Sequence, residues 1–321
     1  MLNFSILTAG NIAQKMAATV SQMPQVSCYA IASRDAQRAK QLAQKYGFQK
    51  WYQEYESLFT DPAVDIVYIG SPHSHHYFHI KQALLAKKHV LCEKPMTVNQ
   101  TQAKELFELA KQQGILLTEA TWTRFMPFVT ELKKLLQQEP IGKIHSLQCS
   151  FGFPVSDRPR MAQPRLAGGA LLDLGIYPLT MAAIVFPQEI QQITSVCTKT
   201  SSGVDAHNSI SLKFVDGTVA SLQSNMLCTL ENKAILYGEK GRIEIPQFWQ
   251  AQEFHILLDD SSSQSYHFPH KISGYEYEVE QFCSAIQQGL SECPAMPAHE
   301  TLKILGIMDT LRKQWDLQHP F

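Results

Sequence analysis

The chain has 321 residues, of which 45% are hydrophobic and 18% charged, and its formal net charge is −1 at pH 7. This length is enough for two domains with a sizeable core, and the composition excludes an intrinsically disordered chain. The balanced charge gives no electrostatic reason to expect a nucleic-acid or anionic-membrane partner.

The seven cysteines favour a reduced, cytoplasmic protein. Their number is odd, no Cys-x-x-Cys pair occurs, and most lie in apolar runs, which is not the pattern of a disulfide framework. The chain opens on a strand pattern without a basic segment, so we expect no signal peptide. The most apolar long stretch, residues 170–186, is interrupted by Asp173 and Pro178 and is too short to span a bilayer.

A short strand, a glycine turn and a helix open the chain. Thr8, Gly10 and Ala13 stand at the three positions of the dinucleotide fingerprint Gly-x-Gly-x-x-Gly/Ala, so only the central glycine and the small third residue are kept. A helix N-terminus beside such a turn binds pyrophosphate through its free N–H groups. We therefore expect Gly10, Asn11 and Ile12 to contact a cofactor, with a plain strand–turn–helix connection as the alternative.

The end of the second strand, residues 26–32, favours NADP over NAD. An NAD site usually carries an acidic residue here to bind the ribose 2′-OH, but this strand ends in Ser33 and Arg34. Arg38 follows at a predicted helix start, and two guanidinium groups suit a 2′-phosphate. We expect Ser33, Arg34 and Arg38 to select NADP. The alternative is a solvated helix face, and the neighbouring Asp35 favours NAD.

Helices and strands then alternate, which predicts a parallel, doubly wound sheet. Further strands are expected at residues 50–52, 64–70, from 89, and 115–118, and helices at 36–46, 55–59, 77–87 and 101–113.

Four histidines, His73, His75, His76 and His79, follow the strand at residues 64–70. A zinc enzyme is a weak alternative suggested by this cluster. We expect no metal, because no cysteine is nearby and a turn followed by a helix scatters the rings.

The stretch from residue 89 to 99 runs from an apolar strand into Glu93-Lys94-Pro95. Ligands of open α/β sheets bind at the carboxyl ends of the strands, where Glu93 and Lys94 lie. Pro95 stiffens the turn that carries them. The alternative is an ordinary exposed ion pair. This trio resembles the signature of the Gfo/Idh/MocA family, which includes glucose–fructose oxidoreductase and inositol dehydrogenase.

Two more segments resemble this family. The segment that begins at Ser71 and Pro72 is similar to its Pro-Asn-x-x-His turn, with His73 in place of the asparagine and His76 at the histidine. The resemblance implies that these residues and Glu93 line the nicotinamide side of the cofactor site.

Residues 119–127 resemble the pattern Glu-Ala-x-Trp-x-Arg-Phe-x-Pro of one branch, the dimeric dihydrodiol dehydrogenases and NADP-dependent D-xylose dehydrogenases. This implies that Trp122 and Arg124 lie beside the nicotinamide and the substrate.

After residue 127 the pattern changes to alternating strands, with helices between and after them. Asp216-Gly217 between two strands is a strong hairpin signal. We predict an NADP-binding Rossmann domain at residues 1–121. A substrate-binding and dimerisation domain would follow at 122–321, as an open, mostly antiparallel sheet covered by helices on one face. Its last helix is expected to be able to pack back on the first domain.

The segment Gly168-Gly169 to Tyr177 is the second candidate for chemistry. Asp173 and Tyr177 are four residues apart, hence on one face of a helix, and an aspartate in so apolar a run needs a polar partner. A capping aspartate and a core tyrosine are the alternative. The segment resembles the family's Gly-Gly-x-x-x-Asp-x-Gly-x-His, with Tyr177 matching the tyrosine of the dihydrodiol dehydrogenase branch.

These motifs predict an NADP-dependent enzyme that moves a hydride between the nicotinamide and a carbinol carbon of a sugar or cyclic diol. Tyr177 is the expected general acid/base, because a nearby Lys94 ammonium would lower the usual phenol pKa of about 10. Lys94 is alternatively a direct ligand of the substrate hydroxyl, and Asp173 would orient the substrate or the lysine. An apolar wall is expected from Trp122, Phe151, Phe153 and Trp249, the last mainly by resemblance.

A catalytically silent NADP-binding sensor on the same fold is the alternative function. We also expect a homodimer built on the sheet of the second domain, because its strands carry apolar residues on both alternations. These residues are Ile210, Leu212, Phe214, Val219, Leu222 and Met226.

Overall fold

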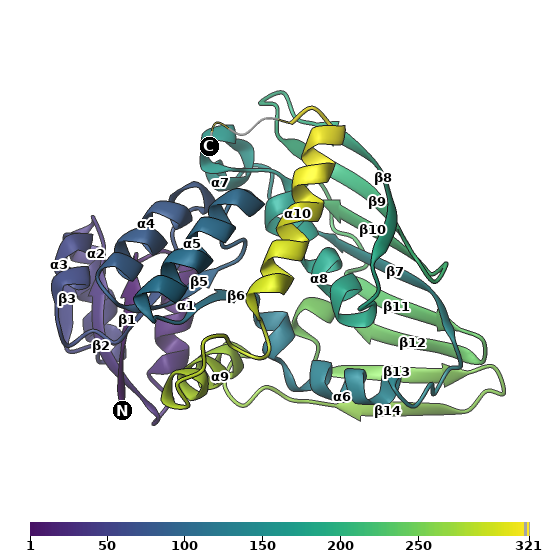
Figure 1. Ribbon diagram of the computed structural model, residues 1–321, viewed down its shortest axis with the longest axis horizontal. Helices are drawn as coiled ribbons and strands as arrows, with labels where there is room; N and C mark the ends of the chain where they lie inside the picture. The colour runs from purple at the N-terminus through teal and green to yellow at the C-terminus, as the bar shows by residue number, and fades with distance from the viewer. Residues whose placement is uncertain (318–319, 321) are drawn as a thin grey trace. The chain divides into compact units, whose positions relative to one another are not determined.

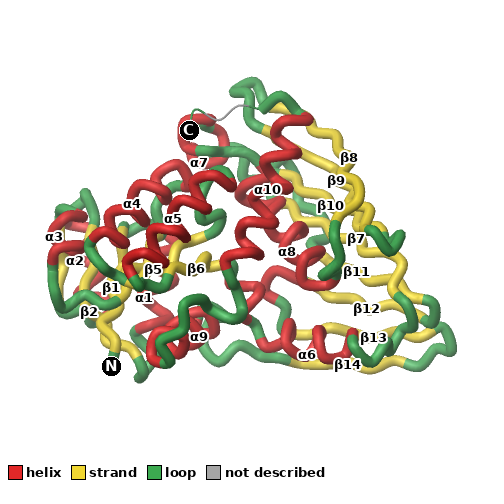
Figure 2. The backbone as a smooth tube through the Cα atoms, in the orientation of Figure 1, coloured by secondary structure: helices red, strands yellow, loops and turns green. Residues whose placement is uncertain are grey.

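The structure is a computed structural model that describes residues 1–317 and 320. It divides into two compact units, shown in Figures 1 and 2. Unit 1 contains Met1–Trp122 and Lys271–Leu302, and unit 2 contains Thr123–His270 and Lys303–Phe321. The first segment of unit 1 thus ends one residue beyond the predicted boundary, whereas the prediction placed Lys271–Leu302 in the second domain.

Helix α9, Glu276–Gln287, explains this difference. Its apolar stripe, which includes Val279, Phe282 and Cys283, joins the core of unit 1 beside Met16 of helix α1. The sequence shows the stripe, but an apolar stripe does not state which sheet or helix it covers.

The sheet of unit 1 is six-stranded, with the order β3-β2-β1-β4-β5-β6 and only parallel pairs, which confirms the predicted Rossmann topology. Most of its strands are buried on both faces and appear in the sequence as continuous apolar runs, whereas the edge strand β3 is largely exposed. The strands are β1 Leu2–Leu7, β2 Val26–Ala32, β3 Lys50–Tyr52, β4 Ile66–Ile69, β5 His89–Glu93 and β6 Leu117–Ala120. The helices of the first segment are α1 Asn11–Val20, α2 Ala36–Tyr46, α3 Tyr55–Thr60, α4 His73–Leu85 and α5 Gln100–Gln113.

Helix α4 begins earlier than predicted, at His73 rather than near residue 77. Pro72 precedes it with φ −59°, an angle that proline fixes and that leads directly into a helix. The four histidines therefore lie on the first two turns of α4 and not in a loop. Their rings meet as two pairs, His73 with His76 and His75 with His79, each with centroids 5.9 Å apart.

Unit 2 contains an eight-stranded sheet with the order β14-β13-β12-β11-β7-β10-β9-β8. All neighbours are antiparallel except β7 and β10, which confirms a mostly antiparallel sheet. The strands are β7 Ile144–Gly152, β8 Ile190–Lys199, β9 Asp205–Phe214, β10 Val219–Asn225, β11 Lys233–Gly238, β12 Gly241–Pro246, β13 Glu253–Leu258 and β14 Ser263–His267.

Strands β13 and β14 were not predicted. Residues of β14 are almost all polar and exposed, so they lack the apolar alternation that identifies a strand. The hairpin at Asp216-Gly217 is confirmed: it joins β9 to β10, and Gly217 has φ +87°.

Helices cover one face of this sheet, as Figures 1 and 2 show for α6, α8 and α10. The helical elements are η1 Trp122–Phe125, α6 Pro127–Leu136, α7 Pro159–Ala162, η2 Pro164–Leu166, η3 Leu171–Gly175, α8 Ile176–Val185, η4 Phe248–Gln250 and α10 Ala298–Gln314. Residues Pro164–Val185 are apolar and long enough to cross a membrane, but 89% of the apolar window is buried inside the protein, as in a core helix.

The apolar residues that suggested a dimer face the core instead. Ile210, Leu212, Phe214 and Leu222 are at most 2% exposed. The β9–β10 register pairs Ile210 with Leu222, which places them on the same, helix-covered face. These four residues therefore belong to the core and cannot form a dimer contact. Met226, also named for the dimer, is buried, and Val219 lies on the opposite alternation, half-buried.

The opposite alternation carries mainly polar side chains, with a few apolar residues among them. On the central strands these are Ser146, Gln148, Ser150, His207, Ser209, Ser211, Lys213, Val219, Ser221, Gln223, Lys233, Ile235 and Tyr237. We define these residues as the outer face of the sheet.

A carboxyl group lies within the core of unit 1. Glu278 of α9 is 0% exposed, and neither of its carboxyl oxygens has a hydrogen-bond partner among the described residues. Burial, with the nearby charges of Glu93 and Glu276, raises the pKa of Glu278 well above its usual value. The group is therefore held as the neutral acid in the folded protein.

We predict that Glu278→Gln flattens the dependence of stability on pH. For an acid whose folded pKa is raised, stability falls as pH increases above the unfolded pKa of about 4.3, by up to about 1.4 kcal/mol per pH unit. Urea unfolding at pH 5, 6, 7 and 8 measures this slope. Glu280→Gln, a change at a partly exposed position of the same helix, should keep the wild-type slope. Equal slopes for wild type and Glu278→Gln would contradict an acid held neutral.

Candidate active-site residues

The turn after β1 keeps the backbone of a dinucleotide-binding loop although its first glycine is absent. Thr8 stands at that position with φ +91°, an angle that β-branched residues rarely adopt. Its N–H donates to Ala32 O at 2.8 Å and its Oγ1 donates to Gly70 O at 3.1 Å, which holds the loop. Gly10 caps α1, and a Cβ there would meet no atom within 4 Å, so its side is open.

Asn11 and Ile12 form the first turn of α1, as expected. Asn11 is exposed, and Ile12 packs so closely on β4 that a Cβ at Gly70 would lie 2.9 Å from Ile12 Cγ2. The free N–H groups of this helix start can bind phosphate oxygens.

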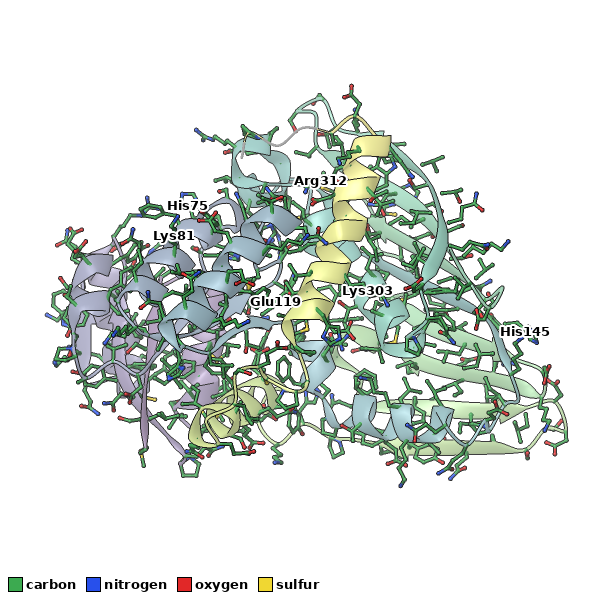
Figure 3. The ribbon with its side chains drawn as sticks, in the orientation of Figure 1. His75, Lys81, Glu119, His145, Lys303 and Arg312 are labelled. Carbon is green, nitrogen blue, oxygen red and sulfur yellow. The ribbon has the colours of Figure 1, made fainter. Side chains whose placement is uncertain are left out.

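The end of β2 presents two exposed arginines. Arg38 pairs with Asp35, the N-cap of α2, at 3.3 Å between Nε and Oδ2. Asp35 is thus engaged by the helix that it caps, and Ser33 Oγ accepts its N–H at 3.2 Å. Burial and the positive charge of Arg34 both lower the pKa of His75 on α4 (Figure 3). The charge of Arg34 thus acts on a residue of α4 as well as at the end of β2.

Lys94 lies in a turn whose backbone is clamped on both sides. His76 Nδ1 is 2.8 Å from Pro95 O, and its Nε2 is 2.7 Å from Ser71 O. Burial lowers the pKa of His76 to about 3, while the contacts with the two carbonyls act in the opposite direction. A neutral ring donates to only one of these two carbonyls. Glu119 of β6, labelled in Figure 3, accepts Met96 N–H at 2.8 Å.

Glu119 also accepts the Thr301 hydroxyl at 2.9 Å. Its pKa is raised by burial, while these hydrogen bonds and the charge of Lys94 act in the opposite direction. Lys94 itself is half-buried, at the carboxyl end of β5.

Glu93 accepts a short hydrogen bond from the hydroxyl of Tyr68, a buried residue of β4. Burial and the negative charge of Glu93 raise the Tyr68 pKa well above its usual value, so the phenol stays protonated. The Glu93 carboxylate at the end of β5 is therefore engaged by a residue of the neighbouring strand β4.

Trp122 is a buried residue at the end of the first segment of unit 1. Its ring stacks on Tyr275 with centroids 4.3 Å apart and planes at 13°. Its buried Nε1 has no hydrogen-bond partner among the described residues, which fits a bound polar group such as a nicotinamide. The open side of Gly10 and the arginines of β2 fit the phosphates. Arg124, two residues on, belongs to unit 2 and is buried.

In unit 2 three of the four residues predicted to form an aromatic wall, Phe151, Phe153 and Trp249, gather around Phe151 of β7, whereas Trp122 belongs to unit 1. The ring centroid of Phe151 lies 4.9 Å from Tyr177, 4.8 Å from Trp249 and 5.2 Å from Phe153. Phe248, which the sequence reading did not include, completes the cluster at 5.6 Å. Phe153, Tyr177 and Trp249 are only partly buried, so this wall has an accessible side.

Asp173 and Tyr177 lie on a helix with an irregular start. The segment Leu171–Gly175 forms a π-turn, which leads into α8 at Ile176, so the regular four-residue spacing does not hold. Asp173 is 8% exposed and pairs with Arg160 of α7 at 2.6 Å between Oδ1 and Nη1. The sequence predicts that Asp173 orients the substrate or Lys94. It does not predict the ion pair with Arg160.

The sequence does not predict three contacts: Arg160 with Asp173, Glu119 with the Met96 amide, and Tyr275 with Trp122. Their signals were weak, because each contact joins residues far apart in the chain or involves a Pro-rich loop. The described residues contain no group of three or more His, Cys, Asp or Glu that could hold a metal ion.

Known proteins resemble this chain along its whole length. The family model for an oxidoreductase family with an NAD-binding Rossmann fold, GFO/IDH/MocA, matches residues 2–121. The model for the GFO/IDH/MocA C-terminal domain matches residues 129–244. The trans-1,2-dihydrobenzene-1,2-diol dehydrogenases of Xenopus tropicalis and Mus musculus are each 32% identical, over 99% of this chain and 99% and 98% of theirs. That of Danio rerio is 33% identical over 98% of this chain and 96% of its own.

Solved structures of oxidoreductases are also similar to this chain over nearly its whole length. A 3-ketoreductase from Actinomadura kijaniata, solved with TDP-benzene and NADP as a tyrosine-to-phenylalanine variant, has a TM-score of 0.89 at 26% identity over 97% of both chains. An aldose–aldose oxidoreductase from Caulobacter crescentus shares the fold, with a TM-score of 0.88 at 24% identity over 97% of this chain and 96% of its own. The chain belongs to the Gfo/Idh/MocA oxidoreductase family.

Proposed function

We propose that this protein is an NADP-dependent dehydrogenase or reductase that acts on a carbinol carbon of a sugar or a cyclic diol. The observation that carries the proposal is the turn at the end of β5, where His76 and Glu119 fix the backbone around Lys94. Rigid placement of a cationic side chain at the carboxyl end of a Rossmann strand suits a catalytic group.

Residues of unit 1 would hold the cofactor. Gly10, Asn11 and Ile12 would contact its pyrophosphate, and Ser33, Arg34 and Arg38 its 2′-phosphate. Ser71, Pro72, His73, His76, Glu93 and Trp122 of unit 1 and Arg124 of unit 2 would surround the nicotinamide half. When bound, NADP supplies hydride acceptance or donation at its nicotinamide ring.

Tyr177 would move the proton of the substrate hydroxyl at its phenol oxygen, as general base or general acid. Lys94 would supply positive charge to that oxygen or to the phenol, and Asp173, held by Arg160, would orient the substrate. Three of the 3-ketoreductase structures are of variants in which a lysine or a tyrosine is replaced. The same two residue types therefore merit replacement here.

The accessible aromatic side chains support a ring-shaped substrate. Phe151, Phe153 and Trp249 present π-faces beside Tyr177, and such faces pack on the apolar face of a sugar or a cyclic diol. Relatives at 30–33% identity are named trans-1,2-dihydrobenzene-1,2-diol dehydrogenases, and the solved neighbours include a 3-ketoreductase. Turnover of NADP with a panel of aldoses and trans-dihydrodiols tests the function. Tight NADP binding without turnover on any of them would instead indicate a silent sensor.

We expect NADP to bind more tightly than NAD, and Arg34→Asp to remove most of this preference. The change replaces an exposed guanidinium with a carboxylate that repels a 2′-phosphate and can accept a ribose hydroxyl. Fluorescence titration gives the Kd for each cofactor. Lys40→Asp, the same charge reversal at an exposed position of α2, should leave the Kd ratio unchanged. Equal wild-type affinities for NADP and NAD would contradict the assignment.

Lys94→Ala and Tyr177→Phe should each lower kcat by about 10²–10⁴-fold, the usual value of acid–base assistance. Tyr177→Phe should leave the Kd for NADP near the wild-type value. Single-turnover rates are measured first, because slow product release can mask the chemical step. The double variant tests whether the two groups act together, since their losses would then not multiply. Tyr237→Phe, on the outer face of the sheet, is the control. A normal single-turnover rate in Tyr177→Phe would remove this residue from the mechanism.

The protein is further proposed to be a cytoplasmic homodimer. All seven cysteines are free thiols, which supports a reducing compartment. The outer face of the sheet supports a two-fold contact, because no helix of the described residues covers it and its small side chains allow close approach.

Light scattering should give a mass of twice the 36.2 kDa chain at micromolar concentration. Ser221→Lys should shift this mass toward the monomer, because Ser221 lies exposed near the centre of the outer face. Gln288→Lys, an exposed position of unit 1, should not. Phe214→Asp is unsuitable for this purpose, since Phe214 is buried against Phe186 and its replacement would disrupt the core. A monomeric mass for the wild type would exclude the dimer.

A further inference from the structure

A buried polar network lies beneath the π-turn that precedes Tyr177. Asp205, the first residue of β9, is 2% exposed, and its Oδ2 accepts Leu171 N–H at 2.7 Å and Asn208 Nδ2 at 3.0 Å. Asn208 Oδ1 in turn accepts the hydroxyl of Ser224 at 2.9 Å. Asn208 and Ser224 are paired residues of β9 and β10 and are at most 1% exposed.

The network touches the π-turn at both ends. At its start, Gly169 has φ +115°, and a Cβ there would lie 2.2 Å from Asp205 Oδ1. At its end, a Cβ on Gly175 would lie 3.1 Å from Ser224 Oγ. Because Gly169 and Gly175 have no Cβ, the backbone on either side of the π-turn can approach Asp205 and Ser224 closely. These two contacts fix where the turn begins and ends.

Stability alone does not explain a buried carboxylate at position 205, because its desolvation is unfavourable. Burial raises its pKa to about 6, while the hydrogen bonds from Leu171 and Asn208 act in the opposite direction, so the group is ionised at pH 7.5 and accepts both bonds. A buried carboxylate is often no more stabilising than an apolar side chain of similar volume. Its distinctive contribution is directional, because it accepts the backbone N–H of one particular residue.

We propose that Asp205 is a positioning residue for Tyr177, and that the Asp205–Asn208–Ser224 network fixes the π-turn so that the Tyr177 phenol is presented beside Phe151. π-turns inside helices occur often at functional sites, and this one ends two residues before the proposed acid/base. The inference rests on the proposed function of Tyr177.

The test compares three variants of the full-length protein. Asp205→Ala removes the acceptor, Asp205→Asn keeps an acceptor oxygen without the charge, and Leu212→Ala opens a cavity on the same strand away from the turn. We measure kcat and KM, the Kd for NADP, the Tm, and hydrogen–deuterium exchange of the segment 168–177.

Asp205→Ala should lower kcat about 10–100-fold, the cost of misplacing a catalytic group by about 1 Å. It should also speed exchange over residues 168–177 and leave the Kd for NADP within about twofold, because no cofactor ligand is altered. Asp205→Asn should recover most of the lost kcat. Leu212→Ala should lower Tm but keep kcat, which separates positioning from general destabilisation.

A wild-type kcat and unchanged exchange in Asp205→Ala would overturn the proposal, as would an equal loss of kcat in Leu212→Ala. If Asp205→Ala does not fold, Ser224→Ala replaces it, with a smaller loss of kcat expected and an unchanged kcat counting against the network. Absence of NADP-dependent turnover in the wild type would refute the proposed function. The exchange comparison then still decides whether Asp205 anchors the turn.

Discussion

The arrangement of unit 1 depends on one requirement, that buried backbone polar groups find partners. The carbonyl of Pro95 and the amide of Met96 lie out of water, and each would cost about 1–3 kcal/mol if unpaired. His76 of the preceding helix α4 lies with Nδ1 2.8 Å from the Pro95 carbonyl, and Glu119 of the next strand β6 accepts the Met96 amide. Because His76 and Glu119 are themselves buried, the backbone of the turn has little conformational freedom, and the backbone of Lys94 is held in place with it.

Much of unit 1 can be inferred from its sequence because the relevant signals are local. Strands such as β2 and β4 are continuous apolar runs between polar turns, and the alternation with helices allows few topologies. Part of the aromatic cluster around Phe151 was also predictable, since Tyr177 lies in a segment that matches a known family, and Phe151 and Phe153 lie in a segment that alternates like a strand.

The remaining features depend on contacts between distant residues, which periodicity does not encode. The pairing of β9 with β10 determines which residues of the two strands share one face of the sheet. The packing of α9 against α1 depends on the whole core of unit 1. Arg160 could not be assigned to Asp173 for the same reason, because a Pro-rich loop gives no register. Thr8 shows the converse case: the fingerprint looked incomplete, yet the backbone keeps the angle that its glycine would adopt.

The division of unit 1 between two chain segments has a consequence for biosynthesis. Residues 1–122 leave the ribosome long before α9, whose Phe282 and Val279 complete the core around Met16 and Ala17. Until α9 has emerged, that apolar surface of α1 lacks the helix that covers it in the folded protein, although residues 123–270 of unit 2 are by then synthesised. The nascent nucleotide-binding fold must therefore wait for its closing helix, and it is a natural substrate for chaperones during that interval.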